Sequence, residues 1–186
     1  MDGQVRAVVC CADPYQAITK KHIRCTYTLI TRDYILGQTK TYTLLMHSAT
    51  CPRMWDIVFN RVESVLTKDE LKNYVNIVDN DSTVLFKVSG DAYGTTRLRN
   101  LIKMNADVMF TTKYGITPLI RATWASNLES VHIILSTIHN HPAAKQYINQ
   151  RAHSNNRNAL ELAQLKQYTA IADLLKKYID QSNCGQ

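Results

Sequence analysis

Apolar residues between positions 117 and 135 recur at helical spacing in two short runs. The first run opens with Thr117, whose hydroxyl can cap a helix, and Pro118, which is tolerated at the first helical position because the N–H that it lacks would have no partner there. Leu119 and Ala122 then lie three residues apart on one face. The second run has one apolar stripe of its own, made by Val131, Ile134 and Leu135. The pattern predicts a pair of short helices, each with a single apolar face.

Such a pair cannot bury both faces alone, so neighbouring copies of the same unit are required. A capping residue, followed by an apolar residue two positions later, also occurs at Thr43, Thr83 and Asn158. The four starts are 40, 34 and 41 residues apart (43 to 83, 83 to 117 and 117 to 158). A second apolar stripe follows each start. The sequence therefore predicts an all-α array of about four helix pairs.

A family resemblance adds to this pattern. The stretch N-A-D-V-M-F-T-T-K-Y-G-I-T-P-L from Asn105 to Leu119 resembles the ankyrin repeat consensus, in register through the A-D-V, Gly115 and the T-P-L. The resemblance covers residues 41–179 and implies an ankyrin-repeat solenoid with short hairpin loops and repeats at about 41–76, 77–110, 111–151 and 152–179. The family period is about 33 residues. The first and third intervals therefore carry insertions, near residues 67–74 and 139–147, that are expected to extend the end of a second helix. Residues 1–40 are then expected to form a degenerate N-terminal cap, and residues 180–186 a flexible tail.

The chain departs from the family pattern at several positions. Ile120 stands where the family has His, and Ser126 and Gln167 stand where it has Gly in the turn between helices. Asn105 replaces a Gly after the second helix, and Asn is the best substitute for Gly in the left-handed conformation. We therefore expect a divergent, irregular array.

The N-terminal segment allows two interpretations. Asp13 and Gly37 are a plausible helix start and end, which favours a degenerate helical pair over 13–36. The Thr, Tyr and Ile content of residues 26–35 is typical of a strand instead. A solenoid end needs a cap, which favours the helical interpretation.

Composition limits the location and the chemistry. Hydrophobic residues make up 45% of the 186 residues, which is enough for a full core. No apolar run is long enough to cross a membrane, and no signal peptide is visible, so we expect a cytoplasmic or nuclear protein that does not enter membranes. The five Cys lack a C-x-x-C pair, so we expect reduced thiols and no metal.

Signatures of catalysis are absent from the sequence. There is no Gly-rich phosphate loop, no G-x-S-x-G and no H-E-x-x-H. We therefore expect no enzyme activity, no catalytic residues and no cofactor.

The ankyrin resemblance implies a binding surface on the hairpin tips and the exposed side of the first helices, together the concave face of such arrays. Trp124 stands out, because Trp, Tyr and Arg dominate interface hot spots. It can be a binding anchor, or it can pack against the next repeat near Leu165. The candidate positions are Asp79, Asn80, Thr111, Lys113, Tyr114, Ile116, Trp124, Ala125, Ser154, Asn155 and Arg157, with Ile77, Ser82, Gly90, Asp91, Ala152, Leu165 and Lys166 in equivalent places.

Three functions fit these features. The first is a monomeric adaptor or inhibitor that binds a protein partner through the concave face. Small viral and intracellular-pathogen ankyrin proteins, which the chain resembles, often target host signalling or ubiquitin-ligase components. The second is a nucleic-acid-associated factor, because residues 91–186 hold 11 basic and 6 acidic residues and Arg97, Arg99 and Lys103 form an alternative basic surface. The third is a small structural subunit of a larger assembly.

Overall fold

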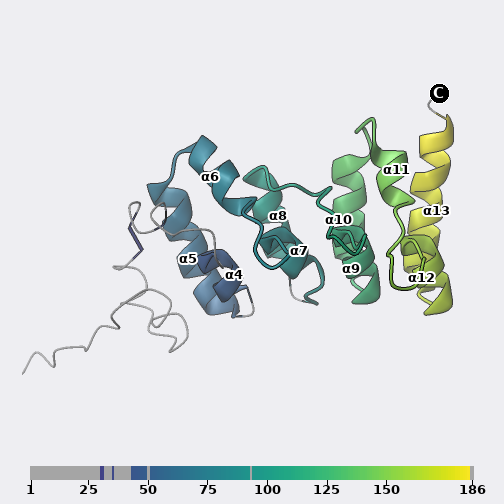
Figure 1. Cartoon of the computed structure of the whole chain (residues 1–186), viewed down its shortest axis with the longest axis horizontal. Coiled ribbons are helices and arrows are strands. Elements are labelled where there is room, and N and C mark those ends of the chain that lie inside the picture. Colours follow the sequence, from purple (N-terminus) through teal and green to yellow (C-terminus); the bar gives the residue numbers. More distant parts are fainter. Residues whose placement is uncertain (1–29, 32–34, 36–42, 50, 93, 185–186) are drawn as a thin grey trace, which may run out of the picture. The chain divides into compact units, whose positions relative to one another are not determined.

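A computed structural model of the chain describes residues 30–31, 35, 43–49, 51–92 and 94–184 (Figure 1). Every regular element in these residues is a helix, and two isolated bridges, Asp79 with Ser82 and Ala152 with Arg157, are their only β pairing. The prediction of an all-α chain is therefore confirmed for the described residues. Contacts divide the chain into two units, 1–71 and 72–186.

The described part of the first unit is built around one helix pair. Helices α4 (Leu44–Ser48) and α5 (Pro52–Val65) pack against each other. Their core includes Trp55, whose ring stacks on Phe59 with the centroids 5.9 Å apart. The predicted cap at residues 1–40 lies outside the described residues except for Ile30, Thr31 and Ile35. Both isoleucines are buried, and Arg61 Nε donates to the Ile30 carbonyl oxygen at 2.9 Å.

The second unit is a two-layer array. Helix α6 (Lys68–Val75) contains the boundary between the units. One layer then holds the short helices α7 (Val84–Ser89), α9 (Pro118–Trp124) and α12 (Ala159–Leu165), with α9 contacting both of the others. The second layer holds α8 (Thr95–Lys103), α10 (Leu128–Ile138) and α13 (Thr169–Cys184), with α10 in the middle (Figure 1). Helix α11 (Ala144–Ile148) contacts α13.

All four predicted helix starts are confirmed. The side chains of Thr43, Thr83, Thr117 and Asn158 each accept a hydrogen bond from a backbone N–H three residues later. At Thr117 the Ile120 N–H donates at 3.2 Å, and Pro118 opens the helix as expected. Asn158 forms a full capping box with Glu161.

Three residues that replace glycine adopt the left-handed conformation that a glycine would favour. The backbone φ angle is 61° at Asn105, 56° at Ser126 and 59° at Gln167. Each ends a helix or the turn between two helices. These turns are therefore left-handed without a glycine, and two of the three positions carry a residue that disfavours this conformation.

Three expectations about helix boundaries were wrong. The insertions do not extend a second helix but form the separate helices α6 and α11. Thr67 starts α6 by exchanging hydrogen bonds with Glu70, and Leu66 is extended, with ψ 146°. The expected tail from residue 180 continues α13 to Cys184, because the sequence has no Gly or Pro between Ile179 and Cys184 to end the helix.

Candidate protein-binding face

Three hairpin tips project from the first-helix layer of the second unit. Each tip closes with its own backbone hydrogen bonds, Ser82 N to Asp79 O at 3.0 Å, Thr112 N to Ile116 O at 3.0 Å and Ala152 N to Arg157 O at 3.0 Å. Left-handed residues make the reversals, and these are Asn80, Asp81, Gly115 and Asn156. The surface made by these tips and by helices α7, α9 and α12 is called the hairpin face below.

Neighbouring tips are joined by hydrogen bonds. The Lys113 N–H donates to both carboxylate oxygens of Asp81, at 3.0 and 2.9 Å. The His153 N–H donates to the Tyr114 carbonyl oxygen at 2.8 Å. Gly115 lies so close to the next tip that an added Cβ would stand 2.5 Å from the Arg151 carbonyl oxygen. The three tips therefore hold each other in place, which lowers the entropy cost of binding a partner.

Large apolar side chains are exposed along the hairpin face. Tyr114 is 56% exposed, Trp124 53% and Leu165 56%. More than half of the Trp124 surface is thus uncovered, which favours an anchor over packing beneath the next repeat. Trp124 lines a hollow of about 330 Å³ together with Gly90, Ile116, Arg121 and Ala125.

The hollow exists because equivalent positions carry side chains of different size. Gly90 follows the cap Thr83 at the same distance in sequence as Trp124 follows the cap Thr117, so the two residues hold equivalent positions at the ends of α7 and α9. Beside Gly90 lies the side chain of Arg121, whose guanidinium carbon is 4.9 Å from the centroid of the Phe86 ring. Partial burial lowers the pKa of Arg121. The sequence analysis did not identify Arg121 as part of this face. The one feature of the sequence that pointed to it was Gly90, which lies against the Arg121 side chain.

Most of the remaining predicted positions are accessible. The structure brings Lys113 to Tyr114, with Nζ 5.1 Å from the ring centroid. The other accessible candidates are Asn80, Thr111, Ala125 and Ser154, which are exposed, and Ile116, Asn155 and Arg157, which are half-buried.

Three predicted positions are not accessible, namely Asp79, Arg97 and Ala152, and Ala152 is only 2% exposed. Asp79 is only 8% exposed, because it closes the first tip and its carboxylate accepts a hydrogen bond from Asn80 Nδ2 at 3.1 Å. Arg97 is 5% exposed, because its guanidinium forms a 2.7 Å ion pair with Asp91. The alternative basic surface was therefore wrong at Arg97. Its exposed members are Arg99, which faces Glu129 at 3.3 Å, and Lys103.

The third tip is braced to helix α12 by an ion pair. Arg151 contacts the Glu161 carboxylate through both of its terminal nitrogens. This hydrogen bonding is the largest cause of a lowered pKa at Glu161, and the Asn158 backbone N–H adds to it. The capping box and the ion pair therefore share one carboxylate, which links the tip to the start of the helix.

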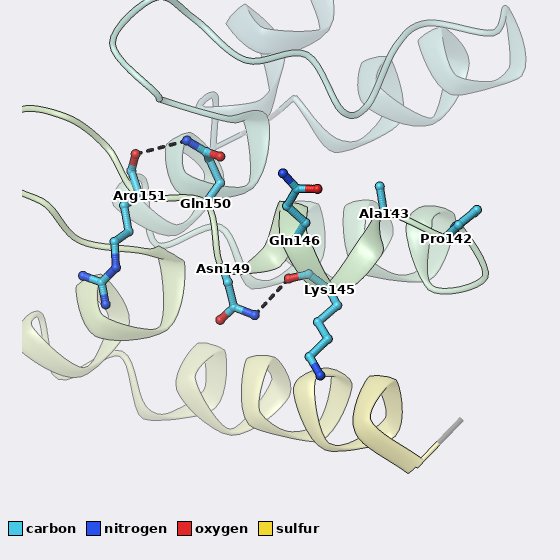
Figure 2. A pocket seen from close by; sticks show the side chains of 7 residues that line it. All are labelled: Pro142, Ala143, Lys145, Gln146, Asn149, Gln150 and Arg151. Carbon is cyan, nitrogen blue, oxygen red and sulfur yellow. Dashed lines mark hydrogen bonds between the residues drawn. The ribbon is translucent and has the colours of Figure 1, made fainter. Parts of the chain in front are cut away.

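A second hollow, of about 560 Å³, lies along α11 (Figure 2). Two of its side-chain amides bind backbone carbonyl oxygens. Asn149 Nδ2 donates to Lys145 O at 2.9 Å, and Gln150 Nε2 donates to Arg151 O at 3.3 Å. Figure 2 shows the Lys145 and Gln146 side chains pointing away from each other. The polar groups here do not converge on a common point.

Helix α11 has a clear structural role. The Tyr147 hydroxyl donates to the Val108 carbonyl oxygen at 2.7 Å, and burial raises the pKa of this phenol. The inserted helix thereby fixes the connection that leads to the second tip. This makes the insertion part of the support for the hairpin face.

Other chemistry was sought in the described residues. No cluster of three or more His, Cys, Asp or Glu that could hold a metal ion is found there. Within the same residues, no helix is both long enough and apolar enough to span a membrane. No protein-family model matches the chain, and a search of curated proteins gives no match.

Proposed function

We propose that this chain is a divergent ankyrin-repeat protein that binds a partner protein through the hairpin face and is not an enzyme. The N-A-D-V and T-P-L motifs support the family, as do the four side-chain caps at the expected positions. The layer of short helices with projecting hairpin tips agrees with it. Viral and pathogen ankyrin proteins make host signalling and ubiquitin-ligase components the first partners to test.

The observation that carries the proposal is the exposed aromatic pair, Tyr114 on the second tip and Trp124 at the end of α9, on a face whose tips are hydrogen-bonded to each other. Exposed aromatic residues on a rigid surface are the usual anchors of protein interfaces. Five large hydrophobic side chains are exposed in the described residues. Tyr114, Trp124 and Leu165 belong to the hairpin face, Val78 directly precedes its first tip, and Leu128 belongs to α10.

The experiment is capture of proteins from a host lysate with the full-length chain and two matched variants. Trp124→Ala removes an anchor from the hairpin face, and Leu128→Ala removes an exposed apolar side chain from the other layer. We expect the same partner with the wild type and Leu128→Ala, and a loss of about 2 kcal/mol or more in its affinity with Trp124→Ala. An unchanged affinity for Trp124→Ala at an unchanged melting temperature would contradict the proposal.

The nucleic-acid alternative lacks an observation of this kind. One of the three residues of its basic surface, Arg97, is buried and paired with Asp91. Arg99 faces a carboxylate as well. Of these three residues, Lys103 alone is exposed and has no ion-pair partner among the described residues.

A further inference from the structure

The hairpin face is electrostatically uneven, and the proposal that follows depends on its being the binding site. Its acidic groups are engaged within the chain. Asp81 accepts the Lys113 N–H, Asp91 pairs with Arg97, and Glu161 pairs with Arg151. The carboxylate of Asp79 is buried. These carboxylates therefore have little capacity left for a partner.

Three basic groups of the same face are directed differently. Lys113, Arg121 and Lys166 form no salt bridge with the described residues. Lys113 lies over the Tyr114 ring and Arg121 over the Phe86 ring, so aromatic surface supports the two cations and no counter-charge neutralises them. Lys166 is exposed directly after Leu165.

These cations lie next to apolar side chains. Arg121 and Trp124 line the same hollow, with Ile116 between the second tip and α9. Tyr114 lies under Lys113, and Leu165 precedes Lys166. Tyr114, Trp124 and Leu165 are thus each next to a cation, an arrangement that complements an apolar side chain flanked by carboxylates.

We infer that the hairpin face binds an acidic peptide segment of its partner, in which Asp or Glu residues flank an aromatic or aliphatic side chain. The apolar side chain enters the hollow between Ile116, Arg121 and Trp124. The flanking carboxylates meet Lys113 on one side and Lys166 on the other. Glycine at position 90 leaves the hollow open, because any larger residue there would push against Arg121.

A peptide fits these observations better than a nucleic acid does. A single strand needs a continuous track of cations and stacking surfaces along its backbone. Here the cations are separated by aliphatic groups, Ile116 and Leu165, from which a phosphate backbone gains nothing. The hollow also suits one side chain more than a row of bases.

The test starts from a displayed library of short random peptides, selected on the full-length chain. We expect enrichment of peptides in which carboxylates flank an aromatic or aliphatic residue. Synthetic versions are then titrated while Trp124 fluorescence is followed, with Trp124→Phe as the control for the buried Trp55. Lys113→Glu should weaken binding at least tenfold, and Lys103→Glu, the same charge change on α8, should leave it unchanged. Affinity should also fall as salt is raised.

The outcomes separate this inference from the proposed function. Enriched peptides without acidic residues that still require Trp124 would overturn the acidic preference and leave the binding face in place. Acidic peptides that bind Lys113→Glu and Trp124→Ala as well as the wild type would overturn both, as would a selection that enriches nothing. A single-stranded oligo(dT) that binds more tightly than the selected peptides and depends on Lys113 would assign the face to nucleic acid instead.

Discussion

Replacement of Gly115 tests whether the hairpin tips support one another. Gly115 has a φ of 73°, where a residue with a Cβ is strained by about 1–2 kcal/mol. The added Cβ would also stand 2.5 Å from the Arg151 carbonyl oxygen and 2.8 Å from the His153 ring. Relief of this contact must separate the second and third tips, which breaks the 2.8 Å bond from His153 N to Tyr114 O and loses about 1 kcal/mol. Gly115→Ala should therefore lower the free energy of unfolding by about 2–3 kcal/mol.

Two further variants separate the contributions. Gly115→Asn introduces a residue that tolerates the left-handed conformation, so the contact with Arg151 dominates. The loss in the free energy of unfolding should therefore be about 1–2 kcal/mol. Gly90→Ala is the control, since its φ is −93° and its Cβ would meet the side chain of Arg121, which can move, and not a backbone carbonyl. That change should cost less than about 1 kcal/mol.

Urea denaturation followed by circular dichroism gives the three free energies, and amide hydrogen exchange gives the state of the His153 N–H. Exchange at His153 should become faster in Gly115→Ala and Gly115→Asn and stay unchanged in Gly90→Ala. A loss below about 0.5 kcal/mol in Gly115→Asn, with unchanged exchange at His153, would refute contact between the tips.

Three other predictions concern stability. Leu135 is fully buried in α10, so Leu135→Ala should cost about 2–5 kcal/mol in urea denaturation, and a loss below about 1 kcal/mol would contradict its place in the core. Ser126 is exposed with a φ of 56°, so Ser126→Gly should stabilise the chain by about 0.5–1 kcal/mol; a lower melting temperature would argue against the left-handed turn. The pKa of Glu161 is lowered in the folded chain, so its pair with Arg151 stabilises the fold fully above the unfolded pKa of about 4.3 and is lost as pH falls through the folded value. Glu161→Gln should therefore make stability less sensitive to acid over that range, and an unchanged pH dependence would speak against the pair.

Local signals in the sequence were enough to predict the helix starts. Thr117 with Pro118, and Asn158 with Glu161, carry the capping chemistry within a few neighbouring residues. The same holds for the left-handed turns, because the register of the repeat marks Asn105 and Ser126 without any knowledge of distant contacts.

The roles of several side chains could not be predicted from the sequence, because they depend on contacts with other segments of the chain. Arg97 looks like a surface cation on its helix until Asp91, which precedes that helix, is seen to pair with it. The role of Arg121 depends on Gly90 and Phe86 in the preceding repeat unit. In α11, Tyr147 reaches back to Val108, a contact between distant segments that the sequence pattern did not indicate.

Site-specific photo-crosslinking is the most direct test of the proposed binding face. A photoreactive phenylalanine analogue is placed at Ala125, beside the hollow, and in a matched variant at Glu129, in the first turn of α10. Both positions are exposed. With the partner recovered by lysate capture, the account predicts a strong crosslink from position 125 and little or none from position 129. A crosslink of equal strength from both positions, or from position 129 alone, would contradict it.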